Sequence, residues 1–426
     1  MAVKLQTHDA ATDAAATATP RPSFAQRLSA GFQALEVRNY RLFWIGQLIS
    51  LTGSWMQTTA QAWLVLQLTG SAFALGLVTT LQFLPIMLLS LFGGVITDRL
   101  PKRKLLLITQ SSALVQAAVF GALVGAGAIQ LWHIYILAAI QGVINAIDNP
   151  ARQSFVPELA GRNHLVNAVA LNSMLFNGAR IIGPALAGLV IGRIGIAPTL
   201  FLNALSFIAV IISLALMNPA EFSAAPPRSE GRVMQKLVEG LRYVWQTPQV
   251  LMIMLVVAAI GTFGYNFSVV LPLLAGFVLK TSAEGFGGLS AFLGIGSLLA
   301  ALTTAYTKRI TVRRLLLGSA AFSVVLGFVA FSTNFALSAG LLIALGFAGI
   351  IFATTANSLL QLIVPDELRG RVMSIYILLF AGSTPIGGFL IGTLSDTIGV
   401  SWTLFVCAVL CALGVAGAAL YRWRTA

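Results

Sequence analysis

The chain has 426 residues, of which 58% are hydrophobic and 9% are charged, and its formal net charge is +13. Soluble domains carry about a quarter of their residues as Asp, Glu, Lys and Arg, so this chain has too few charges to cover itself with water. The length and the mean hydropathy of +0.89 exclude an ordinary soluble enzyme and favour a core solvated by lipid. A nucleic-acid partner is not expected, because it would need a solvated basic surface.

Residues 1–40 are polar and rich in Ala, Thr and Pro, and we expect them to form a disordered cytoplasmic tail without a secretory signal. Beyond this tail, continuously apolar runs of about 20 residues, each long enough to cross a bilayer, recur along the chain. Their pattern is helical rather than the alternation of membrane β-barrels. We predict twelve transmembrane helices at residues 41–68, 73–97, 104–126, 131–153, 166–191, 195–217, 250–279, 285–306, 314–332, 335–361, 370–393 and 398–421.

Lys and Arg indicate the orientation, because basic loops remain on the cytoplasmic side of a membrane. With the N terminus inside, 23 of the 26 basic residues fall on the cytoplasmic side. Arg193 and Lys280 fall outside, and Arg180 lies within a span. We therefore expect a multi-pass membrane protein with both termini in the cytoplasm.

The two halves of the chain are repeats. Residues 24–32 (FAQRLSAGF) match residues 233–241 (VMQKLVEGL), and each segment precedes six spans. The pattern predicts an all-α fold in which two six-helix bundles surround a central cavity. In such a fold the substrate site lies near the membrane midplane, and rocking of one half on the other gives alternating access to it. The expected parts are a tail (1–40), an N-terminal bundle (41–217), a linker with an amphipathic membrane-surface helix (218–249), a C-terminal bundle (250–421) and a second tail (422–426).

Polar side chains recur on one helical face in the first span of each repeat and again in the fourth. Such faces either line a wet central cavity or join helices through hydrogen bonds. Amides and hydroxyls outnumber carboxylates on them, so a strongly cationic substrate is disfavoured. The candidate cavity residues are Gln47, Ser50, Ser54, Gln57, Gln61, Gln141, Asn145, Tyr265, Asn266 and Asn357.

Charged residues in and beside the spans are candidates for gating and ion coupling. Gly94 allows close helix approach beside Asp98 and Arg99 in the connection between spans two and three. Asp148 and Arg152 are four residues apart, which predicts either a salt bridge or a carboxylate that exchanges a proton as the cavity opens.

Arg180 sits at mid-span, where an unpaired charge is costly, so it must face a partner, water or a substrate anion. Gly183, Pro184 and Gly188 in the same span permit close packing or bending. Cys407 and Cys411 fit ordinary helix packing, and no metal-ligand cluster or phosphate loop is evident, so no cofactor is expected.

Several runs resemble the Major Facilitator Superfamily. Residues 94–104 (GVITDRLPKRK) resemble its cytoplasmic-loop signature, with Pro101 where a glycine is usual, and residues 183–188 (GPALAG) are similar to its antiporter motif, with Ala187 for a glycine. The resemblance narrows to the enterobactin-exporter-like branch of bacterial efflux proteins through residues 38–44 (RNYRLFW), 150–159 (PARQSFVPEL) and 365–371 (PDELRGR). Some relatives have an acid near the position of Ser54, and this chain has none there.

The resemblance implies export of drugs, siderophores or other amphiphiles by proton antiport. It would make Asp98, Arg99, Asp148 and Arg152 a cytoplasmic charge relay, and Gly183 and Pro184 the motif that limits leak. The resemblance also implies a monomeric secondary transporter in the lipid bilayer of a bacterial inner membrane. We expect this transporter to make and break no covalent bond. The alternatives are a lysolipid flippase of the same fold, a non-transporting sensor or partner-binding protein and, last, a membrane-embedded enzyme.

Overall fold

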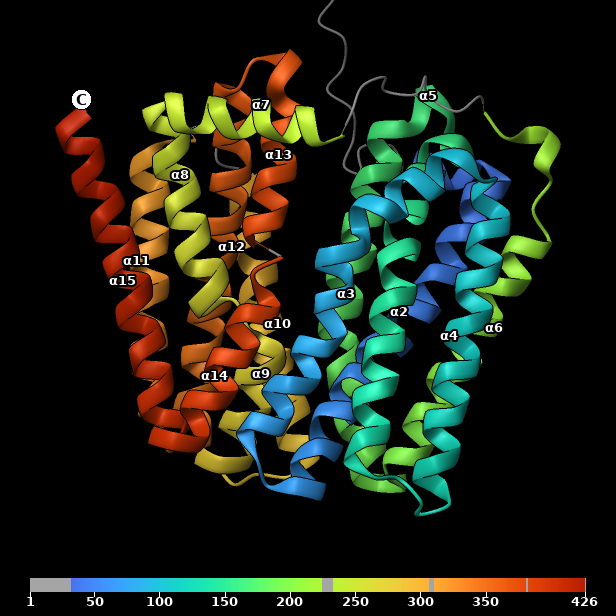
Figure 1. The fold of residues 1–426 in the computed structure, drawn as a ribbon. Coiled ribbons are helices and arrows are strands. Elements are labelled where there is room, and N and C mark those ends of the chain that lie inside the picture. The colour runs from blue at the N-terminus through green and yellow to red at the C-terminus, as the bar shows by residue number, and fades with distance from the viewer. Residues whose placement is uncertain (1–31, 224–232, 306–309, 381, 426) are drawn as a thin grey trace, which may run out of the picture.

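The structure is a computed structural model that describes residues 32–223, 233–305, 310–380 and 382–425. These residues are helical throughout, with no strand among them, which confirms the expected all-α class. Two bundles stand side by side (Figure 1). The first contains η1 (Gln33–Glu36), α2 (Arg38–Thr69), α3 (Ala72–Arg99), α4 (Lys102–Gly125), α5 (Leu131–Ile194) and α6 (Ile196–Ala215).

The second bundle follows the short turn η2 (Pro219–Glu221) and the linker helix α7 (Val233–Gln246). Its seventh span is divided into four pieces and its eleventh, expected to be continuous over 370–393, into two helices of 15 residues each, whereas the other spans are single long helices. The elements are α8 (Pro248–Ala259), η3 (Ile260–Gly264), α9 (Phe267–Leu273), η4 (Leu274–Val278), α10 (Ala283–Ala305), α11 (Val312–Ala330), α12 (Phe335–Ile363), α13 (Asp366–Phe380), α14 (Thr384–Ile398) and α15 (Val400–Thr425).

Ten segments of the described chain are long and apolar enough to cross a membrane. One of them is the 64-residue helix α5, which bends at Gly161, where φ is +68° and only glycine is free of strain. Dividing α5 there and adding α2, which is long but more polar, gives twelve segments of spanning length. The chain is therefore a multi-pass membrane protein.

The seventh span, expected to be continuous over 250–279, contains a break at Tyr265 and Asn266. A π-helical turn precedes the break, and the Asn266 side-chain amide donates a 2.7 Å hydrogen bond to the Thr262 carbonyl. A Cβ on Gly387 of α14 would collide with that same carbonyl oxygen. The absence of a side chain at Gly387 thus lets α14 pack directly on the break.

Part of the expected N-terminal tail is ordered. Residues 1–31 lie outside the described chain, but η1 and the start of α2 pack on the first bundle. The Ala34 amide donates to the Asn167 side chain at 2.9 Å, and the Asn39 side chain donates to the Asn218 carbonyl at 3.0 Å. These polar contacts hold a segment whose composition resembles a tail. At the other terminus, α15 continues to Thr425 and so includes most of the predicted second tail.

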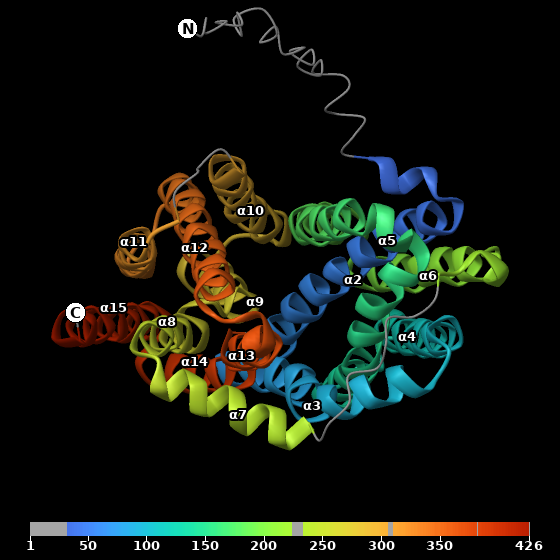
Figure 2. The same cartoon turned by 90° about the horizontal axis from the view of Figure 1, so that it is seen from above.

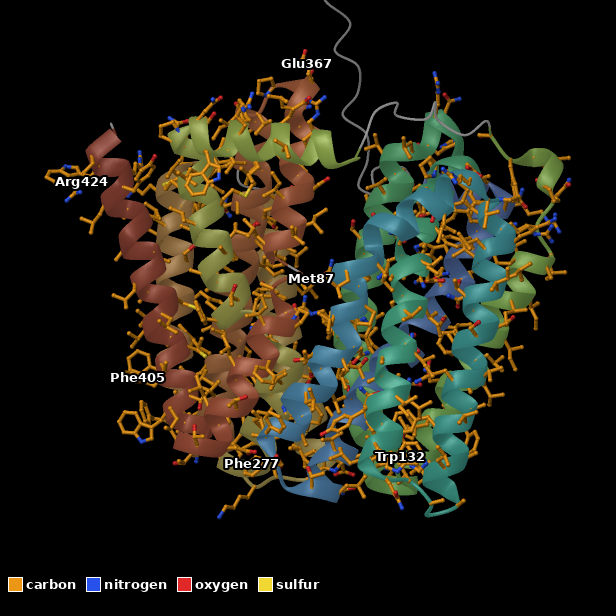
Figure 3. All side chains as sticks on the ribbon, viewed as in Figure 1. Met87, Trp132, Phe277, Glu367, Phe405 and Arg424 are labelled. Atoms are coloured by element: carbon orange, nitrogen blue, oxygen red, sulfur yellow. The ribbon has the colours of Figure 1, made fainter. Side chains whose placement is uncertain are left out.

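The linker helix α7 lies across the end of the second bundle (Figure 2). Glu239 forms an ion pair with Arg371 of α13, and the Gly240 backbone packs on Arg371 and Ile375. Leu241 and Trp245 are exposed on α7, as expected for a helix on a membrane surface. We call this the linker end. Arg424 and Glu367 lie there, whereas Trp132 and Phe277 lie at the opposite end (Figure 3).

The two bundles meet at the end opposite the linker and diverge toward the linker end (Figure 1). Two seams hold them together, one between α5 and α10 and one between α3 and α14. Each seam contains glycines in backbone contact. A Cβ on Gly287 would lie 3.0 Å from the Cα of Gly188, and a Cβ on Gly392 would lie 2.9 Å from the Cα of Gly76. These distances leave no room for a side chain.

Hydrogen bonds reinforce the seam between α3 and α14. The Asp396 carboxylate of α14 accepts from the Ser71 hydroxyl and from the Ala72 amide at the start of α3, each at 2.8 Å. Further along α3, the Thr80 hydroxyl donates to the Pro385 carbonyl at 3.0 Å. The opposite end of the molecule is therefore closed by backbone contact, capping and polar bonds.

We expect Gly287→Ala to favour separation of the bundles at this end, because the added methyl group meets the Pro184 carbonyl and the Gly188 backbone. Overpacking of this kind costs about 1–3 kcal/mol. Gly288→Ala is the matched control, since its Cβ meets only the Phe335 ring edge at 3.7 Å. Spin labels at Ala128→Cys and Thr333→Cys, in loops of different bundles, should report a longer distance only with Gly287→Ala. An unchanged distance distribution would contradict the role of the seam.

Candidate functional site

A cavity of about 630 Å³ lies between the two bundles. Its walls come from α2, the second part of α5, α9, α10 and α12, so both halves of the chain contribute. Most lining side chains are apolar, among them Trp55, Met174, Ile181, Phe267, Phe286 and Leu298. The volume is that of a site for one drug-sized molecule.

Among the described residues that line the cavity, Arg180 alone carries a charge. Its guanidinium carbon lies 5.5 Å from the centre of the Tyr265 ring, across the boundary between the halves. The ring face attracts a cation, which offsets part of the cost of holding a charge at this depth. Tyr265 is placed there by the break in the seventh span and is packed by Phe267 and Phe380, whose ring centroids lie 4.9 and 4.8 Å away.

Aromatic pairs lie beside the cavity. Trp63 of α2 stacks on Phe286 of α10 with ring centroids 5.9 Å apart, so this pair also joins the two bundles. Trp55 packs edge-on against Phe176 of α5 at 6.0 Å. Passage of a molecule toward the opposite end would require Trp63 and Phe286 to separate.

The polar face of the first span lies inside the first bundle and not on the cavity. Gln57 donates to the Gln116 side chain at 3.1 Å and accepts from the Asn203 side chain at 2.7 Å. Ser50 donates to Gln110 and Gln61 to Gln82, at 3.5 and 3.3 Å. Ser54 bonds within its own helix, and Gln47 is buried with neither amide atom hydrogen-bonded. In this conformation Ser50, Gln57 and Gln61 join helices of one bundle.

The other candidate amides also pair locally. Gln141 donates to Asn145 at 3.1 Å, Asn357 accepts from Gln361 at 2.5 Å, and Asn266 secures the break in the seventh span. None of them lines the cavity in this conformation. Of the residues proposed from the sequence as cavity residues, the structure therefore brings together Arg180 and Tyr265.

Asp148 is 1% exposed and is held by three donors. The Thr109 hydroxyl and the Gln110 amide donate to one carboxylate oxygen at 2.7 and 2.8 Å, and Arg152 forms an ion pair with the other oxygen. The Nε of Arg152 is buried without a hydrogen-bond partner. The predicted pair thus exists inside the first bundle.

The expected cytoplasmic gate is only partly described. The side chain of Asp98 lies outside the described structure, and Arg99 is exposed. The close approach expected at Gly94 occurs at Gly93, where a Cβ would collide with the Ala146 carbonyl oxygen, whereas Gly94 faces open space. The two glycines are adjacent in sequence, so only the helix rotation distinguishes them.

The basic residues that follow Pro101 tie the first bundle together. Lys102 forms a 2.8 Å ion pair with Glu158 of α5. Arg103 donates to the carbonyls of Leu214 and Ala215 at 2.7 and 3.0 Å and so caps the C terminus of α6.

The glycines and proline of the fifth-span motif have separate roles. Gly183 packs on α2, where a Cβ would lie 2.5 Å from the Trp55 Cβ. Pro184 lines the cavity, and Gly188 contacts Gly287 across the seam. The motif therefore positions α5 against both its own bundle and the other one.

Sequence reasoning missed several polar cavity residues, among them Thr58, Ser173, Asn177, Ser290 and Ser297. Isolated hydroxyls in an apolar helix give little signal, since they bond to their own helix as readily as to a ligand. In the fifth span, however, Ser173, Asn177, Arg180 and Pro184 follow at helical spacing and share one face. That face could have been recognised from the position of Arg180.

Comparison with solved structures places the fold among known transporters. A bacterial homologue of the human lysosomal transporter Spinster, in an inward-facing and unoccupied conformation, superposes with a TM-score of 0.70 at 12% identity, over 90% of this chain and 97% of that one. The nucleoside transporter NupG gives 0.71 at 10% identity, over 90% and 99%. Together with this fold, the match of residues 29–425 to a family model of the Major Facilitator Superfamily defines the protein as a transporter of that superfamily.

The particular family follows from the sequence comparisons. Residues 29–425 match the transmembrane secretion effector family, and the chain belongs to it. It is 30% identical over 383 residues to the multidrug efflux pump Tap of Mycolicibacterium fortuitum, covering 87% of this chain and 93% of the pump. It is 28% identical over 375 residues to the staphyloferrin A transporter of Staphylococcus aureus, covering 87% and 92%.

We expect Gln57→Leu and Thr58→Val to act differently although the residues are adjacent. Loss of Gln57 removes the donor to the Gln116 side-chain oxygen and the acceptor of the Asn203 side-chain N–H inside the bundle, which should lower stability by about 1–2 kcal/mol. Thr58 lines the cavity, so its substitution should change ligand affinity and leave stability nearly unchanged. Thermal unfolding of the purified variants measures the first effect. Normal stability of Gln57→Leu with lost transport would instead place Gln57 on the transport path.

Proposed function

We propose that this transporter exports an amphiphilic small molecule, a drug-like compound or a siderophore, from the cytoplasm by alternating access. The observation that supports this most is the cavity between the halves, which is apolar except for scattered hydroxyls, one amide and Arg180. Such a lining suits a molecule with a large apolar body and a polar or anionic group. The names of the relatives, a multidrug efflux pump and a siderophore transporter, agree with this class.

The orientation of the chain indicates the side on which the cavity opens. If the 23 basic residues mark the cytoplasmic side, the linker end faces the cytoplasm and the sealed seams face outside. The cavity is then in an inward-facing state that receives substrate from within. Export would require Gly188 to leave Gly287, and Trp63 to leave Phe286, while the linker end closes.

Proton antiport is the proposed source of energy, and Asp148 is the proposed carrier. It is the most deeply buried carboxylate in the described chain and is linked by Thr109 and Gln110 to α4 and by Arg152 to its own helix. A rearrangement of these helices that removed one donor would favour protonation of the carboxylate. Asp148 would then gain and lose a proton as the bundle changes shape.

We expect Asp148→Asn to abolish the transport that a pH gradient drives in proteoliposomes. The asparagine keeps an oxygen that accepts from Thr109 and Gln110 but leaves Arg152 without its carboxylate, so stability should fall, and folding and substrate binding of the variant are measured beside transport. Glu158→Gln is the matched control, because Glu158 pairs with Lys102 near the linker end and should leave the response to the gradient in place. Transport that continues in Asp148→Asn, or in wild type with a protonophore, would remove Asp148 as carrier.

The substrate can be sought in cells. A strain that lacks this protein should accumulate the transported compound in a screen of dyes, antibiotics and siderophores, and restoring the gene should reverse the accumulation. Equal accumulation of every compound with and without the protein would count against export.

A further inference from the structure

The facing edges of α5 and α10 touch along one part of their length and separate along the rest. The contacts run from Gly192 on Glu284, through Gly188 on Gly287, to Ile181 on Gly294. Residue numbers fall along α5 as they rise along α10, so the helices are antiparallel at this seam. From Gly188 to Ile181 and from Gly287 to Gly294 the step is seven residues on each helix, which fixes the register.

The same register, continued toward the linker end, places Asn177 opposite Leu298 and Met174 opposite Ala301. All four residues line the cavity, so the cavity extends between the two helices at this level. Met174 and Leu298 are 59% and 53% exposed, which shows that this space is not closed by other helices. We call it the crevice. Because α5 and α10 span the membrane, the surface outside the crevice faces lipid.

Arg180 lies at the inner end of the crevice, next to Ile181, where the seam ends. The Tyr265 ring covers the guanidinium, but a ring satisfies none of its five N–H donors by a strong hydrogen bond. Among the described residues no carboxylate forms an ion pair with it. A cation held at this depth therefore favours an anionic group and repels a cationic one.

These observations also fix the shape of a ligand. An apolar crevice that faces lipid suits a hydrocarbon tail, and a cation at its inner end suits a single negative charge. Resting on the proposed export function, we propose that the site binds a single-tailed amphiphile with one negative charge, its head on Arg180 and its tail in the crevice. The amphiphile reaches the cavity from the membrane leaflet at the linker end.

The head-group claim can be tested by binding to the purified protein in nanodiscs. The probe is dansyl-labelled undecanoic acid, and its uncharged methyl ester is the control ligand. Arg180→Gln should weaken binding of the acid by at least about tenfold, as expected for loss of a charge-assisted contact, and leave the ester unchanged. Arg180→Lys, which keeps the charge, should restore part of the affinity.

Two outcomes would overturn the head-group claim. One is equal affinity of wild type for the acid and the ester, and the other is unchanged affinity for the acid in Arg180→Gln. Binding of zwitterionic lysophosphatidylcholine as tightly as the acid would also overturn the requirement for net negative charge.

The crevice is tested by filling it. Ala301→Trp should weaken binding of the long-tailed acid and not of a dansyl acid with a short tail. Leu302→Trp is the matched control, because Leu302 is the next residue, is 52% exposed and does not line the cavity. In proteoliposomes with the long-tailed acid preloaded in the bilayer, only Ala301→Trp should slow transport. Equal binding and equal rates in the two variants would overturn the membrane route.

The two proposals fail in different ways. If the acid binds as described but is not moved across proteoliposome membranes, the proposal of export is wrong and the proposal of the binding site is retained. If a different compound is exported while the acid does not bind, the binding site fails and export stands.

Discussion

Backbone contact between glycines of opposite bundles is the constraint on which the rest of the structure depends. Gly188 on Gly287 and Gly76 on Gly392 bring helices of the two halves together without side chains between them. Contact of this kind depends on close fit rather than on a hydrophobic driving force, which a lipid solvent does not supply between helices. It is therefore sensitive to small displacements and can be made and broken. The cavity exists because the halves are held at one end only, and Arg180 lies where that contact stops.

Polar groups within the spans are used mainly to hold each bundle rigid. Gln57, Gln116 and Asn203 form a buried set of amides, and Asp148 is held by donors from two helices. Since lipid offers no hydrogen bonds, partners must come from the chain itself, and a bundle joined in this way moves as one body. Rocking requires both that each half moves as a rigid body and that the seam between the halves is held weakly. Arg180 departs from this pattern, because an aromatic ring is its partner across the halves.

The sequence predicts the class, the repeat and nearly every span, because long apolar runs and the distribution of Lys and Arg reflect the bilayer directly. It predicts the site less well. A polar stripe such as Gln47 to Gln61 has the same spacing whether it faces a cavity or a neighbouring helix, and only the rotation of the helix decides. The same ambiguity separates Gly93 from Gly94. The break at Tyr265 was also missed, because a single Asn266 that bonds to backbone carbonyls does not interrupt the apolar run in the hydropathy profile. Arg180 was singled out as a residue in need of a partner, since a charge at mid-span has few alternatives, and its guanidinium lies over the Tyr265 ring.

The capping of α3 by Asp396 has a consequence for the shape of the helix itself. Ser71 caps α3 from within by accepting from the Ala74 amide at 3.1 Å, but the Ala72 amide is satisfied by a carboxylate of the other bundle. When the halves separate, the Ala72 amide loses this acceptor and hydrogen-bonds to water instead. The negative charge of Asp396 also moves away from the positive end of the helix dipole. The first turn of α3 then has one cap instead of two and is more prone to fray. The sealed and parted states would thus differ in the length of an ordered helix as well as in the angle between two rigid bodies.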